Sequence, residues 1–212
     1  MNPSILIKEL STTKELKDFI KFPFSLYTNH PYWVPPLIND ELNALSKDKN
    51  PVFANAKAFF YGAYTPAGKM VGRIAAIINE NDLKQGDKKL RFGWIDMIDD
   101  LSVTKALIEK VTEKAREYHL DYIEGPMGFT SMDKVGLLTD GYDQIANMMT
   151  WYHYPYYNAH LEQLGLKKEK GFIDMSFLLA NSKPEVFKKT AEAIRRRCRS
   201  RGYLQHRGLA RL

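Results

Sequence analysis

The sequence predicts an α+β fold, with a mixed and mostly antiparallel sheet flanked by helices on both faces. Two observations support this: segments of helical period alternate with β-rich runs, and three β-rich runs follow one another directly in the middle of the chain. The predicted order is β-α-α-β-β-β-α-β-α-β. With 212 residues, 44% of them hydrophobic, the chain can bury one sizeable core.

The first elements are a strand and two helices. Ile5–Leu10 is a short apolar strand candidate. Thr12 and Glu15 have the spacing of a capping box, which predicts a helix beginning after Thr12. The proline-containing aromatic segment from Phe22 to Pro36 should interrupt that helix. A second helix is expected over Ile38–Leu45.

Three adjacent strands are expected next. Ala58–Tyr64 and Met70–Ile78 are β-rich and are joined by Thr-Pro-Ala-Gly, which predicts a hairpin. Arg91–Ile98 alternates between apolar and polar residues and predicts a third strand beside them.

A long helix and a short strand follow. Ser102 is expected to cap a helix of about 17 residues, whose buried stripe includes Val103, Leu107 and Val111. Tyr122–Glu124 is a short strand that ends at Gly-Pro. The segment 127–154 shows no clear period, which is typical of either a functional loop or a covering flap.

The segment from Tyr156 to Phe177 predicts a short helix, a glycine stop and a final strand. Leu161 and Leu164 share one helical face. Gly165 stands where a left-handed residue ends a helix, and Leu166 follows as the apolar residue that packs back.

This helix–glycine–strand unit resembles the C-terminal half of the GNAT superfamily of N-acyltransferases, and the predicted element order is similar to the GNAT order. A closer resemblance is to an uncharacterised bacterial branch whose members often carry two GNAT-like halves. The strings that carry it are Pro31-Tyr-Trp-Val-Pro-Pro, Val71-Gly-Arg, Phe92-Gly-Trp, Gly125-Pro-Met, Gly136-Leu-Leu and Pro155-Tyr-Tyr.

The resemblance implies acetyl-CoA or another acyl-CoA as cofactor. GNAT enzymes hold its pyrophosphate on backbone N–H groups at a strand–helix junction, which corresponds here to Asp96–Ser102. The candidate cofactor-binding residues are therefore Ile98, Ser102 and Val103. This junction contains three carboxylates and no glycine, so the alternative is a helix N-terminus capped by its own acids.

The resemblance also implies a tyrosine acid that protonates the departing thiolate. Leu161 occupies the position expected for it, and Tyr157 lies one helical turn earlier. The candidate catalytic residues are Tyr157 and Tyr156, with His153 as a candidate general base. Packing of these aromatic side chains against the sheet is the alternative.

GNAT folds open their acyl and acceptor clefts near the segment that follows the fifth strand. The candidate substrate pocket therefore comprises Gly125, Met127, Phe129, Asp133, Trp151 and Tyr152. Asp133 is expected either to orient an amine or to cap a turn.

Charge and composition exclude several classes of function. The chain contains 31 Lys and Arg and 25 Asp and Glu. Ten of these bases and two of these acids lie in residues 181–212, which leaves 21 bases and 23 acids in residues 1–180. The body thus lacks the basic footprint of a nucleic-acid-binding protein. Cys198 is the only cysteine, no spacing predicts a metal site, and no run approaches the roughly 18 apolar residues of a membrane span. We expect a cytoplasmic protein with no membrane partner.

The C-terminal residues differ in composition from the rest. A GNAT-like domain is expected over residues 1–180, and a helix over Lys183–Ile194, with Ser182 and Glu185 as its capping box. Residues 195–212 contain seven Arg and no Lys. This tail is interpreted as a nucleic-acid or anionic-lipid arm, or as the remnant of a truncated or frame-changed second domain. It is expected to be poorly packed.

The leading hypothesis is acyl-CoA-dependent transfer of an acyl group to the amine of a small molecule. The alternative is a degenerate, non-catalytic GNAT-like domain that serves ligand binding or dimerisation, including homodimer formation.

Overall fold

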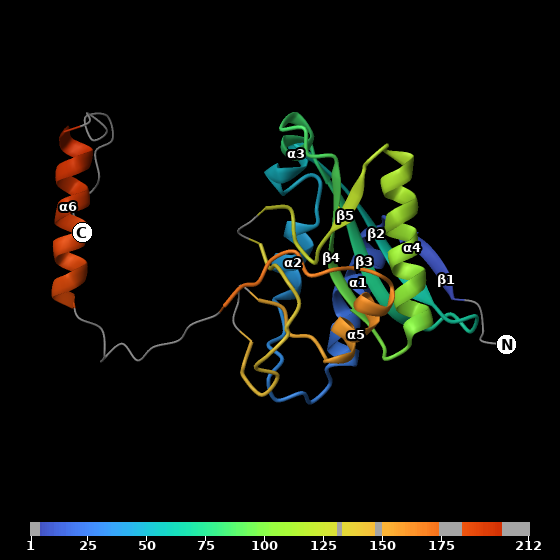
Figure 1. Ribbon diagram of the computed structural model, residues 1–212. Coiled ribbons are helices and arrows are strands. Elements are labelled where there is room, and N and C mark those ends of the chain that lie inside the picture. Colours follow the sequence, from blue (N-terminus) through green and yellow to red (C-terminus); the bar gives the residue numbers. More distant parts are fainter. Residues whose placement is uncertain (1–4, 131–132, 147–149, 174–183, 201–212) are drawn as a thin grey trace. The chain divides into compact units, whose positions relative to one another are not determined.

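The computed structural model describes residues 5–130, 133–146, 150–173 and 184–200. The chain divides into two compact units, residues 1–171 and 172–212 (Figure 1). The predicted boundary at residue 180 lies outside the described residues, so that boundary stays a prediction.

The first unit is built on a five-stranded sheet in which the strands lie in sequence order. The first four strands are antiparallel neighbours, and the fifth pairs in parallel with the fourth. The strands are β1 (Leu6–Leu10), β2 (Ala56–Tyr64), β3 (Met70–Asn79), β4 (Lys89–Met97) and β5 (Tyr122–Glu124). The predicted hairpin is confirmed, and Gly68 in its turn has φ +82°.

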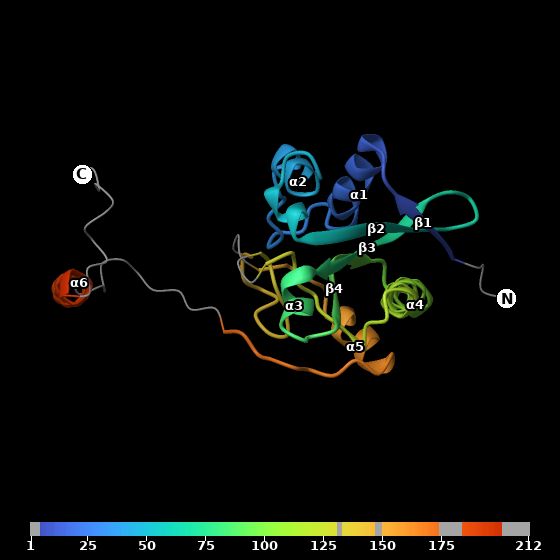
Figure 2. The same ribbon diagram turned by 90° about the horizontal axis from the view of Figure 1, so that it is seen from above.

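Helices cover both faces of this sheet (Figure 2). One face carries α1 (Thr13–Leu26) and α2 (Ile38–Ala44), and the other carries α4 (Leu101–Glu117) and α5 (Tyr156–Gln163). Two short elements that the sequence did not predict complete the unit, the 3₁₀ turn Pro51–Ala54 and α3 (Glu80–Lys84). The predicted α+β class and the GNAT-like element order are confirmed from β1 to α5.

Each face of the sheet has its own hydrophobic core. Under α4 and α5 the core includes Ile74, Phe92, Leu107, Tyr157 and Leu161. Under α1 and α2 it includes Phe19, Ile20, Phe60, Ile77 and Trp94. Because side chains alternate along a strand, β3 and β4 supply both cores.

A bulge in β4 shapes the edge of the second core. Arg73 pairs with Asp96 and Ala75 with Gly93, so β4 holds one residue more than β3 between these two pairs. Trp94 lies in the bulge with φ +47°, a left-handed conformation that is uncommon for a bulky residue. Its indole Nε1 donates to Glu41 on α2 at 2.8 Å.

The beginning of α1 is as predicted, but its predicted end is wrong. Thr12 and Glu15 form the capping box. The helix does not stop at the proline-containing segment, and instead continues through Pro23 to Leu26. Pro23 has no N–H to donate to the Phe19 carbonyl, and the Arg73 guanidinium donates to this carbonyl instead.

The end of α5 has the predicted geometry. Gly165 has φ +86°, its N–H donates to the Glu162 carbonyl, and the Leu166 N–H donates to the Leu161 carbonyl. These two bonds form a Schellman motif. Residues 166–173 contain no strand, and the rest of the predicted final strand lies outside the described residues.

The second unit contains α6 (Pro184–Ser200), which extends six residues beyond the predicted end at Ile194. Its apolar residues Phe187 and Ile194 are exposed. Ser182, half of the predicted capping box, lies outside the described residues, as do residues 201–212. In the described part of the chain, no helix combines the length and apolar character needed to cross a bilayer.

Candidate functional site

The junction between β4 and α4 is a turn closed by a carboxylate. Asp100, rather than the predicted Ser102, is the N-cap of α4. Its Oδ1 accepts from the Ser102 backbone N–H at 2.8 Å and from the Ser102 hydroxyl at 2.7 Å. These hydrogen bonds from Ser102 hold the pKa of Asp100 below its usual range. Ser102 is the second residue of the helix, and its N–H and hydroxyl are donors to the capping carboxylate.

The candidate cofactor-binding residues do not offer an open row of N–H groups. The Ile98 N–H donates to the Val71 carbonyl at 3.0 Å, and the Val103 N–H donates to the Asp100 carbonyl at 3.1 Å. Val103 is fully buried. Asp99 is exposed beside this turn, with His160 Nε2 3.3 Å away. An incoming pyrophosphate would therefore meet occupied amides and nearby carboxylates.

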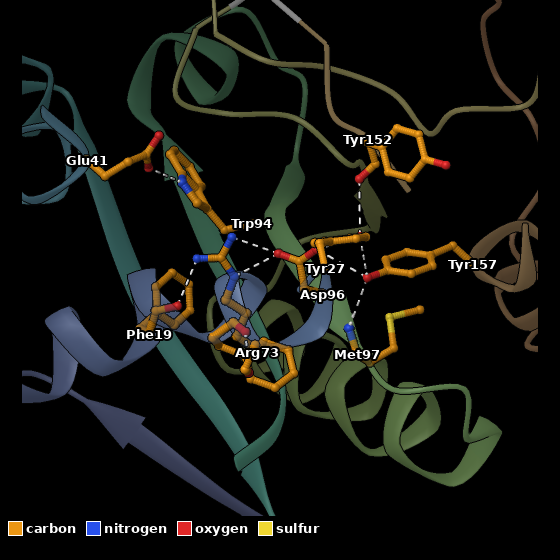
Figure 3. A network of polar contacts seen from close by, with 11 residues as sticks. Phe19, Tyr27, Glu41, Arg73, Trp94, Asp96, Met97, Tyr152 and Tyr157 are labelled. Carbon is orange, nitrogen blue, oxygen red and sulfur yellow. Dashed lines mark hydrogen bonds and ion pairs between the residues drawn. The ribbon is translucent and has the colours of Figure 1, made fainter. Parts of the chain in front are cut away.

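A buried ion pair lies where β3 and β4 face each other across the bulge (Figure 3). Arg73 Nε and Nη2 donate to Asp96 Oδ2 at 2.8 and 2.7 Å. Both side chains are almost completely inaccessible to solvent. Both N–H groups donate to the same carboxylate oxygen, and these charge-assisted hydrogen bonds offset part of the cost of burying the two charges.

Arg73 also completes helix α1. A proline at position 23 has no N–H to donate to the carbonyl of Phe19, four residues earlier. Arg73 Nη1 donates to this carbonyl oxygen at 2.8 Å instead. The guanidinium thus joins the interrupted helix to Asp96, which explains why α1 continues through its proline.

Two buried tyrosine hydroxyls contact the other oxygen of Asp96. The Tyr27 and Tyr157 hydroxyl oxygens each lie 3.2 Å from Oδ1 and 2.9 Å from each other, and the Tyr27 hydroxyl also lies 3.2 Å from the Tyr152 carbonyl oxygen. The Met97 N–H donates to the Tyr157 hydroxyl at 3.3 Å. Burial, followed by the nearby Asp96 charge, raises the pKa of both tyrosines well above the usual value. At neutral pH both are neutral donors locked in a hydrogen-bond network.

The other two candidate catalytic residues lie beside this network. The Tyr156 hydroxyl donates to the Met97 carbonyl at 2.6 Å, and burial raises its pKa. His153 is fully buried, and burial lowers its pKa to about 4. The Leu138 N–H donates to His153 Nδ1 at 3.4 Å, which fits a neutral ring. The structure therefore places Tyr156, Tyr157 and His153 together at the end of β4.

Four of the six candidate pocket residues have structural contacts close to the sheet. Gly125 approaches β4 so closely that an added Cβ would lie 2.3 Å from the Phe92 carbonyl oxygen. The Met127 N–H donates to the same carbonyl. The buried Phe129 offers its carbonyl to Arg91 and Asn79. Asp133 accepts from the Thr130 N–H at 2.7 Å, which closes a turn.

The other two, Trp151 and Tyr152, line a pocket on the α1–α2 face of the unit. Its volume of about 20 Å³ is room for roughly one water molecule. Its walls come from the segment after α1, the β3 and β4 ion pair, and the long segment after β5. They include Trp33, Val34, Arg73, Asp96, Lys134 and Trp151.

Sequence reasoning missed the residues at the centre of this arrangement, Arg73, Asp96, Tyr27 and Lys134. A signal for the first two was present, because Arg73 is the only charged residue of β3, and Asp96 lies between apolar residues near the end of the neighbouring strand β4. Pro23 gave a second signal, since a proline inside a helical pattern leaves a carbonyl that needs another donor. Among the described residues, no group of three or more His, Cys, Asp or Glu could hold a metal ion.

Two curated relatives match most of this chain. The protein YghO of Escherichia coli is 35% identical over 166 residues, which cover 77% of this chain and 42% of YghO. The bacterial ceramide synthase of Caulobacter vibrioides is 29% identical over 169 residues, which cover 79% of this chain and 44% of the synthase. The chain thus spans less than half the length of both relatives. No family model matches the chain.

Solved structures with a similar arrangement are acetyltransferases and related proteins. Glucosamine-6-phosphate N-acetyltransferase from Arabidopsis thaliana is 10% identical, with a TM-score of 0.47 over 82% of this chain and 98% of that chain. A tandem GNAT protein from the clavulanic acid biosynthesis pathway is 15% identical, with a TM-score of 0.48 over 76% of this chain and 43% of that chain. A GNAT-family acetyltransferase from Staphylococcus aureus is 19% identical, with a TM-score of 0.40 over 59% and 74%.

Proposed function

We propose that residues 5–171 form a GNAT-like domain that binds a ligand and does not itself hold acyl-CoA at the N-terminus of α4. The observation that carries this proposal is the closed turn at Asp100. Its carboxylate takes the amide of Ser102, which a pyrophosphate would need.

Electrostatic repulsion also disfavours a pyrophosphate at this turn. Repulsion between a carboxylate and a phosphate at close range costs on the order of 1–4 kcal/mol per contact at moderate dielectric. Asp99 and Asp100 both lie at this turn. The curated relatives are more than twice as long as the matched segment, which leaves room in proteins of that length for a CoA site elsewhere.

Isothermal titration of acetyl-CoA into the full chain at physiological ionic strength tests the proposal. We expect no saturable heat and no rise in the unfolding temperature at millimolar ligand. A variant with Asp99→Asn and Asp100→Asn serves as the matched comparison, because Asn keeps a capping oxygen and removes both charges. One-to-one binding by the unaltered chain would overturn the proposal.

A second candidate is that the domain itself transfers an acyl group to an amine. It is favoured by the polar groups at the end of β4, where the Tyr156 and Tyr157 hydroxyls meet the backbone of Met97. The name of the Caulobacter relative agrees with this chemistry, since a ceramide is an amide of a long-chain amine. Saturable acetyl-CoA binding that Tyr156→Phe leaves intact, together with a loss of turnover in that variant, would favour this candidate.

A further inference from the structure

The segment that joins α1 to α2 forms one wall of the pocket described above. We call residues 28–37 the strap; the residues that it contributes to the lining are Trp33, Val34 and Pro36. Within the described chain, residues 31–36 make a single backbone–backbone hydrogen bond, which the Tyr32 carbonyl accepts from the Ala146 N–H at 3.0 Å. A segment with so few backbone bonds depends on its side chains for its position.

His30 holds the strap through both nitrogens of its ring. The Tyr32 N–H donates to Nδ1 at 3.3 Å. Nε2 lies 3.1 Å from the Tyr152 hydroxyl, which itself donates to the Tyr142 carbonyl at 2.8 Å. That hydroxyl therefore accepts from His30, and the proton of the neutral ring is on Nε2. Neutral His30 thus joins the strap to the segment after β5 and keeps Nδ1 as the acceptor for the Tyr32 N–H.

Four tyrosine rings surround His30. Their centroids lie 4.5, 5.3, 6.0 and 6.3 Å from that of the imidazole, in the order Tyr152, Tyr154, Tyr32 and Tyr27. Tyrosine hydroxyls stay protonated well above neutral pH, so these rings supply no counter-charge. Burial lowers the pKa of His30 below its usual value. The charged residue nearest to these partners along the chain is Asp143; burial, three neighbouring tyrosines and Asp143 raise the pKa of Tyr152.

We propose that the strap is a pH-sensitive cover of this pocket, closed while His30 is neutral and released when His30 is protonated. Protonation places an N–H on Nδ1, where it faces the Tyr32 N–H as donor against donor, so this hydrogen bond is lost. Within the described chain, the Tyr32 backbone then keeps only the bond from Ala146. Release of the strap moves the wall that Trp33 and Val34 form, and so widens a recess that holds about one water molecule when closed.

The direction of the pH dependence follows from the two states of His30. The closed strap favours the neutral ring, whereas release places the ring in water with a usual pKa of about 6.5. The released form therefore binds more protons as the pH falls through about 6.5, and the equilibrium moves toward release. Between pH 7.0 and pH 5.5 the opening constant can rise by at most about eightfold.

Native-state hydrogen exchange of the full chain, followed by NMR, tests this device at the Tyr32 and Ala146 amides. Exchange rates at pH 7.0 and pH 5.5, each divided by the intrinsic rate at that pH, give the opening constants. We expect these constants to rise by about three- to eightfold at both amides as the pH is lowered. Amides at the centre of β3 serve as the internal reference, because they report global unfolding.

Two histidine variants separate the strap from the rest of the domain. His30→Asn cannot titrate and keeps the closed geometry, because an Asn side-chain oxygen accepts from the N–H two residues further on. In this variant the opening constants of Tyr32 and Ala146 should not depend on pH. His153→Gln is the matched control, since it removes a second buried histidine. Its strap amides should respond to pH as those of the unaltered chain do.

The proposal is overturned if the Tyr32 and Ala146 opening constants of the unaltered chain are the same at both pH values, or if they rise equally in His30→Asn. If His30→Asn does not fold, His153→Gln decides, because loss of the strap response in that variant would assign the response to His153. The device does not depend on whether the domain holds acyl-CoA.

Discussion

Asp96 has no free acceptor capacity with which to act as a general base. Arg73 occupies one oxygen, and the Tyr27 and Tyr157 hydroxyls occupy the other. The residue therefore holds β3, β4, α1 and α5 together from a buried position.

We predict that Asp96→Asn destabilises the protein by about 3 kcal/mol or more, because it leaves the Arg73 guanidinium buried without its counter-ion. Urea denaturation monitored by circular dichroism would measure the change. Asp99→Asn is the matched control, since Asp99 is exposed, and it should change the free energy of unfolding by less than about 0.5 kcal/mol. A loss below about 1 kcal/mol for Asp96→Asn would contradict the role assigned to the pair.

His153 should make the stability depend on pH. Its pKa is about 4 in the folded protein and about 6.5 when unfolded, so the unfolded chain binds more protons between these values and stability falls as the pH falls. From pH 7 to pH 5.5 the expected loss is about 1 kcal/mol. His153→Gln should show a correspondingly shallower dependence in urea titrations at the two pH values. Parallel pH profiles for the two proteins would argue against a buried neutral ring.

At this scale the sequence predicted some neighbours but not their roles. Tyr156, Tyr157 and His153 do lie together, as a cluster of aromatic residues in one short segment suggests. Tyr27 and Lys134 could not both be assigned to the surroundings of Asp96, because they are 107 residues apart and only the folded sheet brings their segments there. Whether any of these residues takes part in catalysis stays a prediction.

Among the elements, α4 has the terminus that decides between the two functional hypotheses. Its cap is Asp100, and the hydroxyl of Ser102 donates to that cap. The sequence predicted Ser102 as the cap, with the acids of Asp96–Ser102 as the alternative. The choice between them depends on which residue leaves the sheet with an extended backbone, and that is set by where β4 stops pairing with β3.

We predict that Asp100→Ala lowers the free energy of unfolding by about 1 kcal/mol, the usual effect of losing an N-cap. Ser102→Ala removes one hydrogen bond to the cap and leaves the backbone N–H bond in place, so its effect should be only a few tenths of a kcal/mol. Chemical denaturation of both variants at pH 7 provides the comparison. Equal losses, or a larger loss for Ser102→Ala, would assign the cap to Ser102 after all.

Strands and the long helix were predictable because their periods are strong and local. The continuation of α1 through Pro23 was not, because the compensating donor lies 54 residues away on another element. The short helix α3 was also missed, since five residues carry too little periodicity to be recognised.

At the scale of the whole molecule, both hydrophobic cores consist of residues from the first unit. We therefore predict that a fragment of residues 1–171 unfolds in a single cooperative transition, as small domains usually do. Differential scanning calorimetry would check this. Removal of residues 1–10 from the same fragment is the control, because it deletes β1 and should lower the unfolding temperature clearly. A fragment without a cooperative transition would contradict the assignment of both cores to this unit.

The fold class was predictable from the sequence, whereas the activity was not, because one fold supports many chemistries. The GNAT-like element order follows from patterns spread over most of the first unit. Cofactor binding depends on a few atoms at one turn, and there the acids of Asp96–Ser102 and the resemblance predict different outcomes.

The bond from Arg73 to the Phe19 carbonyl means that α1 is not an autonomous helix. A synthetic peptide of residues 11–28 has the capping box but lacks the guanidinium, so we expect its helical content to be confined to the residues before Pro23. Completion of α1 has to wait until β3 is in place. The last turn of α1 carries Pro23, which lines the pocket, and Tyr27 follows directly after it. One wall of that pocket therefore forms only when β3, from the middle of the chain, contacts α1 near its beginning.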